Sequence, residues 1–228
     1  EIDNANVKLR SEIVNKLTQE DGHYIIVSYP EAIAEKILSK KYIKSNSFTV
    51  TKNEILPVET FLDFLFEYGY KQEEFVFEPG QFAWRGGIFD VYSYSEEYPY
   101  RIELAGEQVD SIRQFDTNTQ LSVKEVDKLH IMPYLSSVET VEQRVPMMEF
   151  LGKDTVCWLK NIRDVRSQLN ANFHKMEEEF LADDGKTTVL NPTDFYIDGD
   201  NLCEELAKYS CAEINSNTLE NSCLTLDF

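Results

Sequence analysis

Residues 78–113 read EPGQFAWRGGIFDVYSYSEEYPYRIELAGEQVDSIR. Short runs of aromatic and β-branched residues alternate here with turn-forming pairs such as Gly86-Gly87 and Ala105-Gly106. Runs spaced this closely are typical of antiparallel strands joined by tight turns. The pattern therefore predicts a β-meander, with strands expected at residues 74–77, 82–85, 88–92, 101–104, 108–115 and 126–132.

The flanks of this meander have a different rhythm. A helix is predicted at 57–68, ending at Gly69, and residues 1–50 read as helix, strand (24–27), helix from Pro30 to Leu38, and strand (48–50). Beyond the meander we expect a buried strand at 155–159, a long helix at 161–181, a helix around 202–209 and a final strand near Leu224. The α/β order of both flanks indicates a parallel sheet with helical crossovers. The predicted organisation is one α/β unit (1–50 and 135–228) interrupted by an inserted β-rich domain (51–134).

Composition limits the kinds of function. The 228 residues carry 41 acidic against 22 basic side chains, a net charge of −19, which disfavours broad binding to a phosphate backbone. The four cysteines have no metal-ligand spacing and the three histidines are scattered, so we expect reduced thiols in a cytoplasmic protein without a metal. No apolar run is long enough to indicate export or a membrane span. The start at Glu1 without methionine suggests a fragment of a longer chain.

Motifs that could carry catalysis are incomplete. Gly185-Lys186-Thr187 ends like a phosphate-binding loop, but Phe180 stands where that loop needs its first glycine. Acidic pairs are plentiful, as expected on the solvated faces of so acidic a chain, and none lies beside a candidate nucleophile or base. These residues favour a protein that is not an enzyme.

Arg85 and Arg101 stand out on neighbouring predicted strands, beside Trp84 and several tyrosines. Arginine with aromatic neighbours is typical of the energetic centre of a protein–protein interface. An equally simple interpretation is an edge sheet in which these arginines pair with acids of the same sheet, namely Asp90, Glu103 or Asp110. Composition alone leaves both interpretations open.

The segment GQFAWRGGIFDV at residues 80–91 resembles the G-[EQ]-F-x-x-R-G-G-[IL]-[IV]-D-[IV] segment of transcription-repair coupling factors (Mfd). The similarity continues in one register through YPYRIE at 98–103, GEQVDSIR at 106–113, Phe115-Asp116 and Thr119-Gln120. The excision-repair helicase subunit UvrB carries the same segment. In both families the resemblance implies a β-rich domain that docks onto the damage-recognition ATPase UvrA.

Family resemblance assigns UvrA contact to Arg85 and Arg101. It would also place an aromatic at position 105, where this chain has Ala105 after Leu104. Trp84, at a position where the family has a small residue, is the expected substitute for that apolar contact.

The resemblance also implies that the α/β flanks are a degenerate helicase-like ATPase domain. A working magnesium-binding strand ends in acidic residues, whereas residues 156–159 are followed by Lys160 and Asn161. We therefore expect no cofactor in this chain, with ATP and Mg²⁺ confined to the translocase part of the full-length protein. RNA polymerase and DNA would be bound by regions outside this sequence.

Three alternatives stay open at this point. The chain could be a fragment of UvrB itself, which would require a phosphate loop upstream and acids near residue 160. The arginine and aromatic strip could bind DNA directly. The same strip could instead pack against another domain of the full-length protein and so act as an autoinhibitory surface.

Overall fold

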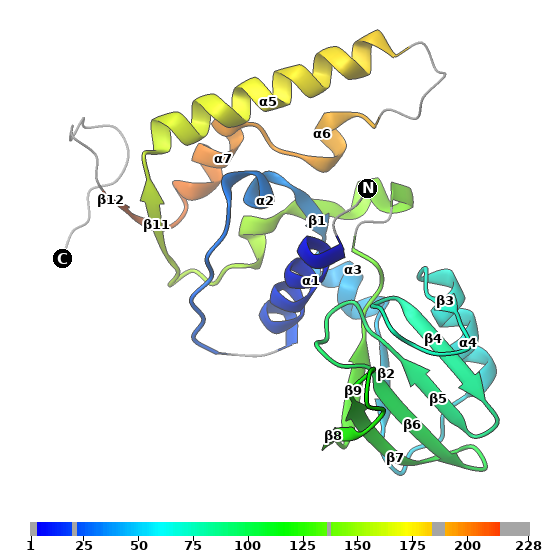
Figure 1. Cartoon of the computed structure of the whole chain (residues 1–228). Helices are drawn as coiled ribbons and strands as arrows, with labels where there is room; N and C mark the ends of the chain where they lie inside the picture. The colour runs from blue at the N-terminus through cyan, green and yellow to red at the C-terminus, as the bar shows by residue number, and fades with distance from the viewer. Residues whose placement is uncertain (1–3, 20–21, 136–137, 184–189, 215–228) are drawn as a thin grey trace. The chain divides into compact units, whose positions relative to one another are not determined.

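The computed structural model describes residues 4–19, 22–135, 138–183 and 190–214. The backbone forms two compact units (Figure 1). Unit 1 comprises Glu1–Asp21 and Lys40–Ser137, and unit 2 comprises Gly22–Ser39 and Val138–Phe228. Both units combine helices with β-strands, so the predicted mixed α/β class is confirmed, and most of the strands lie in unit 1.

The largest sheet of unit 1 has six strands: Lys71–Gln72 (β3), Gln81–Arg85 (β4), Ile88–Val91 (β5), Tyr100–Ala105 (β6), Gln108–Phe115 (β7) and Ser122–Glu125 (β8). They lie in sequence order; β3 runs parallel to β4, and all later neighbours pair antiparallel (Figure 1). Gly86 and Gly106 adopt left-handed backbone angles (φ +60° and +70°) in the turns after β4 and β6, a conformation that glycine reaches without strain. The predicted meander is therefore confirmed.

Helix α4 (Val58–Glu67) packs its apolar side against one face of this sheet. Phe61 and Leu65 are fully buried, and the Phe61 ring lies 5.3 Å from the ring of Phe89 on β5. Gly69 follows the helix with φ +81°, as predicted for a glycine that ends a helix. Because side chains alternate along a strand, filling one face with the core leaves the other face for polar residues.

The rest of unit 1 consists of helices α1 (Asn4–Gln19) and α3 (Lys40–Ser45) and a strand pair, β2 (Phe48–Thr51) with β9 (Lys128–Ile131). Helix α1 and strand β2 were predicted, and α3 was not. The parallel arrangement expected for β2 is wrong, because β2 pairs antiparallel with β9. Val50 and Leu129, which are register partners in this pair, are both buried in the core shared with α4.

Unit 2 contains two strand pairs and several helices. Strand β1 (Lys36–Leu38) pairs antiparallel with β10 (Arg144–Pro146), and β11 (Val156–Lys160) pairs parallel with β12 (Ser210–Ile214). The helices are α2 (Pro30–Ala34), η1 (Val138–Gln143), η2 (Met147–Phe150), α5 (Ile162–Ala182), α6 (Pro192–Phe195) and α7 (Gly199–Leu206). A cluster around Leu169, Leu202 and Leu206 forms the apolar centre between α5 and α7. The long helix predicted at 161–181 is confirmed.

Two predictions for residues 24–38 are wrong. Residues 24–27 form no strand, and Ile25 and Val27 are 96% and 90% exposed. The helix that starts at Pro30 ends at Ala34, and Ile37 and Leu38 lie in strand β1 instead. Both residues are buried in that strand. Tertiary burial therefore overrides the helical spacing of the four apolar residues Ile33, Ala34, Ile37 and Leu38.

The ends of the meander also differ from the prediction. Residues 74–77 form no strand, and Phe75 and Phe77 are half exposed; the short strand β3 lies before them, at Lys71–Gln72. The strand expected at 126–132 is β9, which pairs with β2, whereas β8 at 122–125, which pairs with β7, was not predicted. Val126 donates its backbone N–H to the carbonyl of Ile112 on β7, and the next residue, Asp127, accepts a hydrogen bond from the backbone N–H of Lys52. The backbone therefore changes partners between β8 and β9.

The strand predicted at 155–159 exists as β11, but the prediction that it is buried is wrong. Trp158 is 69% exposed and Val156 is 48% exposed, since in the described part of the chain β11 pairs only with β12 and packs only its other face on the cluster of unit 2. Strand β12 was not predicted. The final strand expected near Leu224 and the Gly185-Lys186-Thr187 segment lie outside the described residues.

Candidate protein-binding surface

Four charged residues form a row across the sheet of unit 1, on the face opposite α4. Asp90 on β5 is the register partner of Arg101 on β6, Arg101 is the partner of Arg113 on β7, and Arg113 is the partner of Glu125 on β8. Register partners on adjacent strands project to the same face, so the pairing brings together charges that are far apart in sequence.

Asp90 connects the two arginines that were predicted as binding residues. Arg101 donates from Nε to Oδ1 of Asp90 at 2.6 Å and from Nη2 to Oδ2 at 2.8 Å. Arg85, at the end of β4, donates from Nη2 to the same Oδ2 at 2.7 Å. The Asp90 side chain is only 2% exposed, against 42% for Arg85 and 16% for Arg101. The structure thus joins both arginines through one buried carboxylate.

Each arginine has further support from its surroundings. Arg85 donates to the backbone carbonyl of Glu74, and its guanidinium lies 5.0 Å from the ring centre of Phe75. Arg101 donates to Oε1 of Gln120 at 2.9 Å and lies 4.4 Å from the ring centre of Phe115. Cation–π contacts of this kind add to the ion pairing.

Hydrogen bonding to Asp90 raises the pKa of Arg101 above its ordinary value. Gln120 holds its side chain toward Arg101 from a loop with left-handed backbone (φ +60°), an uncommon conformation for a residue other than glycine. Asp116 stabilises that loop by accepting hydrogen bonds from the backbone and side chain of Thr119. Arg101 is therefore held from two sides.

A second ion pair lies on the same face. Glu103 on β6 accepts hydrogen bonds from Arg113 and from the Ser111 hydroxyl. Arg85 and Arg101 thus pair with one of the three acids that the sequence offered, Asp90, whereas Glu103 pairs with Arg113. Arg113 was not singled out from the sequence, because its closeness to Arg101 depends on the strand register.

Trp84 projects to the opposite face from Arg85, since the two are neighbours on one strand. Its ring stacks on Phe89 at 5.5 Å between centres, and its Nε1 donates to the carbonyl of Gly86 at 2.7 Å. With 42% of Trp84 exposed, an aromatic surface remains accessible there. The structure does not bring this surface together with the two arginines.

Ala105 is the exposed last residue of β6, in the tight turn to Gln108 on β7. A register shift between Glu103 and Leu104 changes the pairing just before it, and Leu104 packs partly against the core. At position 105, where the resemblance would place an aromatic, this chain therefore exposes a methyl group.

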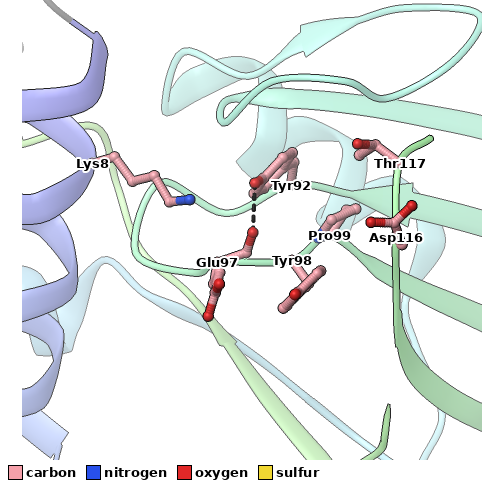
Figure 2. A pocket seen from close by; sticks show the side chains of 7 residues that line it. All are labelled: Lys8, Tyr92, Glu97, Tyr98, Pro99, Asp116 and Thr117. Atoms are coloured by element: carbon pink, nitrogen blue, oxygen red, sulfur yellow. Dashed lines mark hydrogen bonds between the residues drawn. The ribbon is translucent and has the colours of Figure 1, made fainter. Parts of the chain in front are cut away.

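Figure 2 shows a small pocket of about 240 Å³ in unit 1, near the end of β5. Tyr92 donates from its hydroxyl to the backbone carbonyl of Glu97 at 2.6 Å, and the Lys8 ammonium lies 5.9 Å from the ring centre of Tyr92. Asp116 also lines the pocket. The lining mixes opposite charges and contains none of the predicted binding residues.

Residues after β11 have structural tasks. Asn161 adopts left-handed backbone (φ +50°), and its side chain accepts a hydrogen bond from the backbone of Asp164 as the N-cap of α5. Glu213 accepts a hydrogen bond from the backbone of Ile162.

Among the described residues, no group of three or more His, Cys, Asp and Glu side chains is placed to hold a metal ion. The helices in the described part of the chain are all too short or too polar to cross a membrane.

Comparison with known proteins identifies the β-rich part of unit 1. Residues 48–135 match the family model of the UvrB interaction domain, a range that runs from β2 to just past β9. This part of the chain is therefore similar to the UvrB interaction domain.

The chain is also similar to transcription-repair-coupling factors, over up to 74% of its length. It is 30% identical over 172 residues to the Bacillus subtilis (strain 168) protein, covering 74% of this chain and 14% of that protein. Identity to the factor from Staphylococcus aureus (strain bovine RF122 / ET3-1) is 32% over 148 residues, 62% of this chain and 12% of the relative. Identity to the factor of strain USA300 is 39% over 101 residues, 43% and 9% of the two chains. These matches confirm the resemblance, and the chain spans about one seventh of the length of the Bacillus subtilis relative or less of the others.

Proposed function

We propose that this chain is a docking module for UvrA and has no catalytic activity of its own. One observation carries the proposal: within the part of the chain that is similar to the UvrB interaction domain, Arg85 and Arg101 come together through Asp90 on the face that α4 leaves open. The motif that resembles coupling factors supplies the same two arginines, which supports their assignment to the contact.

Arginine suits this task for physical reasons. Its planar group donates several hydrogen bonds in a fixed geometry and stays charged when it is desolvated in an interface. We propose that Arg85 and Arg101 contact acidic groups of UvrA. The exposed part of Trp84 and the turn at Ala105 would lie outside this contact. Charge-assisted contacts of this kind contribute roughly 1.5–3 kcal/mol each when they are desolvated.

The remaining activities belong to the full-length relatives. We propose that the whole protein is an ATP-driven DNA translocase that links stalled RNA polymerase to excision repair in the cytoplasm. ATP, Mg²⁺, RNA polymerase and DNA would then be bound outside this chain, which would need no cofactor. The net charge of −19 argues against direct DNA binding by this part.

An intramolecular role is compatible with docking. Another domain of the full-length protein would mask the arginine face until UvrA replaces it. A fragment of UvrB itself is the weaker alternative, because the relatives described above are coupling factors. In addition, β11 ends in Lys160 and is followed by Asn161, where an acidic end would be required.

A pull-down and calorimetry with UvrA from the same organism test the proposal. Arg85→Ala and Arg101→Ala should each weaken binding by at least about tenfold while the fold survives. The matched control is Arg166→Ala, which removes an exposed, salt-bridged arginine from unit 2 and should leave the affinity unchanged. Failure of the wild-type chain to capture UvrA would contradict the proposal.

A further inference from the structure

Asp90 is more than a partner that neutralises charge. We infer that Asp90 is a positioning residue, which holds Arg85 and Arg101 in the geometry that the docking partner binds. This inference rests on the proposed docking function.

The contacts of the Asp90 carboxylate carry the argument. Nη2 of Arg85 and Nη2 of Arg101 both donate to Oδ2, at 2.7 and 2.8 Å. Two guanidinium groups held against one oxygen atom would repel each other if that oxygen did not carry negative charge. Asp90 lies within β5, 2% exposed, so the carboxylate itself is fixed by the sheet.

The remaining donors of the two arginines define what a partner meets. Asp90 and Gln120 occupy Nε and Nη2 of Arg101, and Asp90 and the Glu74 carbonyl occupy Nη2 and Nη1 of Arg85. Within the described residues, Nη1 of Arg101 and Nε of Arg85 donate to no protein acceptor, and Nη1 and Nη2 of Arg85 each keep one N–H without a protein acceptor. Because Asp90 fixes both guanidinium groups, it also sets the direction of the N–H groups that remain for a partner.

Charge and geometry predict opposite effects of removing the carboxylate. Asp90→Asn makes the surface more positive by one charge, so Coulomb attraction alone would tighten binding to an acidic partner. An asparagine side chain, however, has only one acceptor oxygen and places an NH₂ donor against the arginines. Positioning by Asp90 therefore predicts weaker binding despite the more favourable net charge.

The test is a double-mutant cycle by calorimetry with purified UvrA. The variants are Asp90→Asn, the Arg85→Ala/Arg101→Ala double substitution, and all three changes together. Glu59→Gln is the charge-matched control, because Glu59 is an exposed residue on α4, on the other side of the sheet. Circular dichroism and melting temperature verify that each variant is folded.

We expect Asp90→Asn to weaken UvrA binding by at least about fivefold and Glu59→Gln to change it by less than about twofold. In the double-arginine background, adding Asp90→Asn should leave the affinity unchanged and raise the melting temperature, because it removes a buried charge that has lost its partners. A higher melting temperature would show that the triple variant is folded, so its weak binding could not be ascribed to unfolding.

Unchanged or tighter binding by Asp90→Asn, beside weak binding by the double-arginine variant, would overturn the positioning role and leave the docking proposal intact. Wild-type affinity from the double-arginine variant would instead overturn the proposed docking site, and the positioning role with it. A further loss on adding Asp90→Asn to the double-arginine variant would show that Asp90 does not act through the arginines.

Discussion

Arg101 binds both carboxylate oxygens of Asp90, through Nε at 2.6 Å and Nη2 at 2.8 Å, from a neighbouring strand of the same sheet. Arg85 reaches the same carboxylate through a single hydrogen bond from the end of β4. The two arginines are thus unequal. Arg101 is mostly buried and doubly bonded to Asp90, whereas Arg85 is more exposed and has more surface to offer a partner.

This inequality predicts different losses of stability. Arg101→Ala leaves the Asp90 carboxylate buried with one partner and should lower the free energy of unfolding by about 3 kcal/mol. Arg85→Ala removes a more exposed pair and should cost about 1 kcal/mol or less. Urea unfolding followed by circular dichroism measures both. Equal losses from the two substitutions would contradict the unequal anchoring.

A close approach between α5 and α7 predicts a second effect. A methyl group on Gly199 would lie 2.8 Å from the Cα of Arg166 and would also overlap the carbonyl of that residue. Gly199→Ala should therefore destabilise unit 2 by about 2 kcal/mol or more, because backbone cannot move aside as a side chain can. Gly152→Ala is the control, since nothing lies within 4 Å of its added methyl group, and it should change stability by less than about 1 kcal/mol. Similar melting temperatures for the two variants would refute this packing.

Buried tyrosines predict how stability depends on pH. Burial raises the pKa of Tyr94 to about 12 and also raises the pKa values of Tyr70 and Tyr100. In the unfolded chain tyrosines ionise near pH 10, so the unfolded state gains stability from ionisation before the folded state does. The contribution of Tyr94 is complete below about pH 10 and is lost as pH rises toward 12.

Tyrosinate absorbance and urea unfolding, measured across this alkaline range, test the tyrosine prediction. Tyr94→Phe should remove one late-titrating group and reduce the pH dependence. A full complement of tyrosines that ionise near pH 10 in the folded protein would contradict it.

The central meander could be predicted because its signals are local. Glycine turns and alternating residues place strands β4 to β7 within a residue or two of the structure. Residues 24–27 and Ile37 were misassigned because a short apolar run does not say whether it will be buried or which strand it will meet. Val156 and Trp158 show the same limit: the strand was predicted correctly, but its exposure depends on which neighbours it has.

The candidate binding surface could be predicted only in part. Arg85 and Arg101 were identifiable from their motif, and Asp90 was one of three acids that could have paired with them. The strand register decides which acid pairs with the arginines. Register depends on turn geometry and on a shift between Glu103 and Leu104, which cannot be read from the sequence. The alternation rule would have placed Trp84 on the opposite face from Arg85, had it been applied to these two neighbours.

The proposed docking of UvrA through Arg85 and Arg101 can be tested by a single titration. UvrA is titrated into the wild-type chain and into the folded Arg85→Ala/Arg101→Ala double variant under identical salt. We expect measurable binding by the wild-type chain and a loss of at least about a hundredfold in affinity for the double variant. Wild-type affinity from the double variant would contradict it.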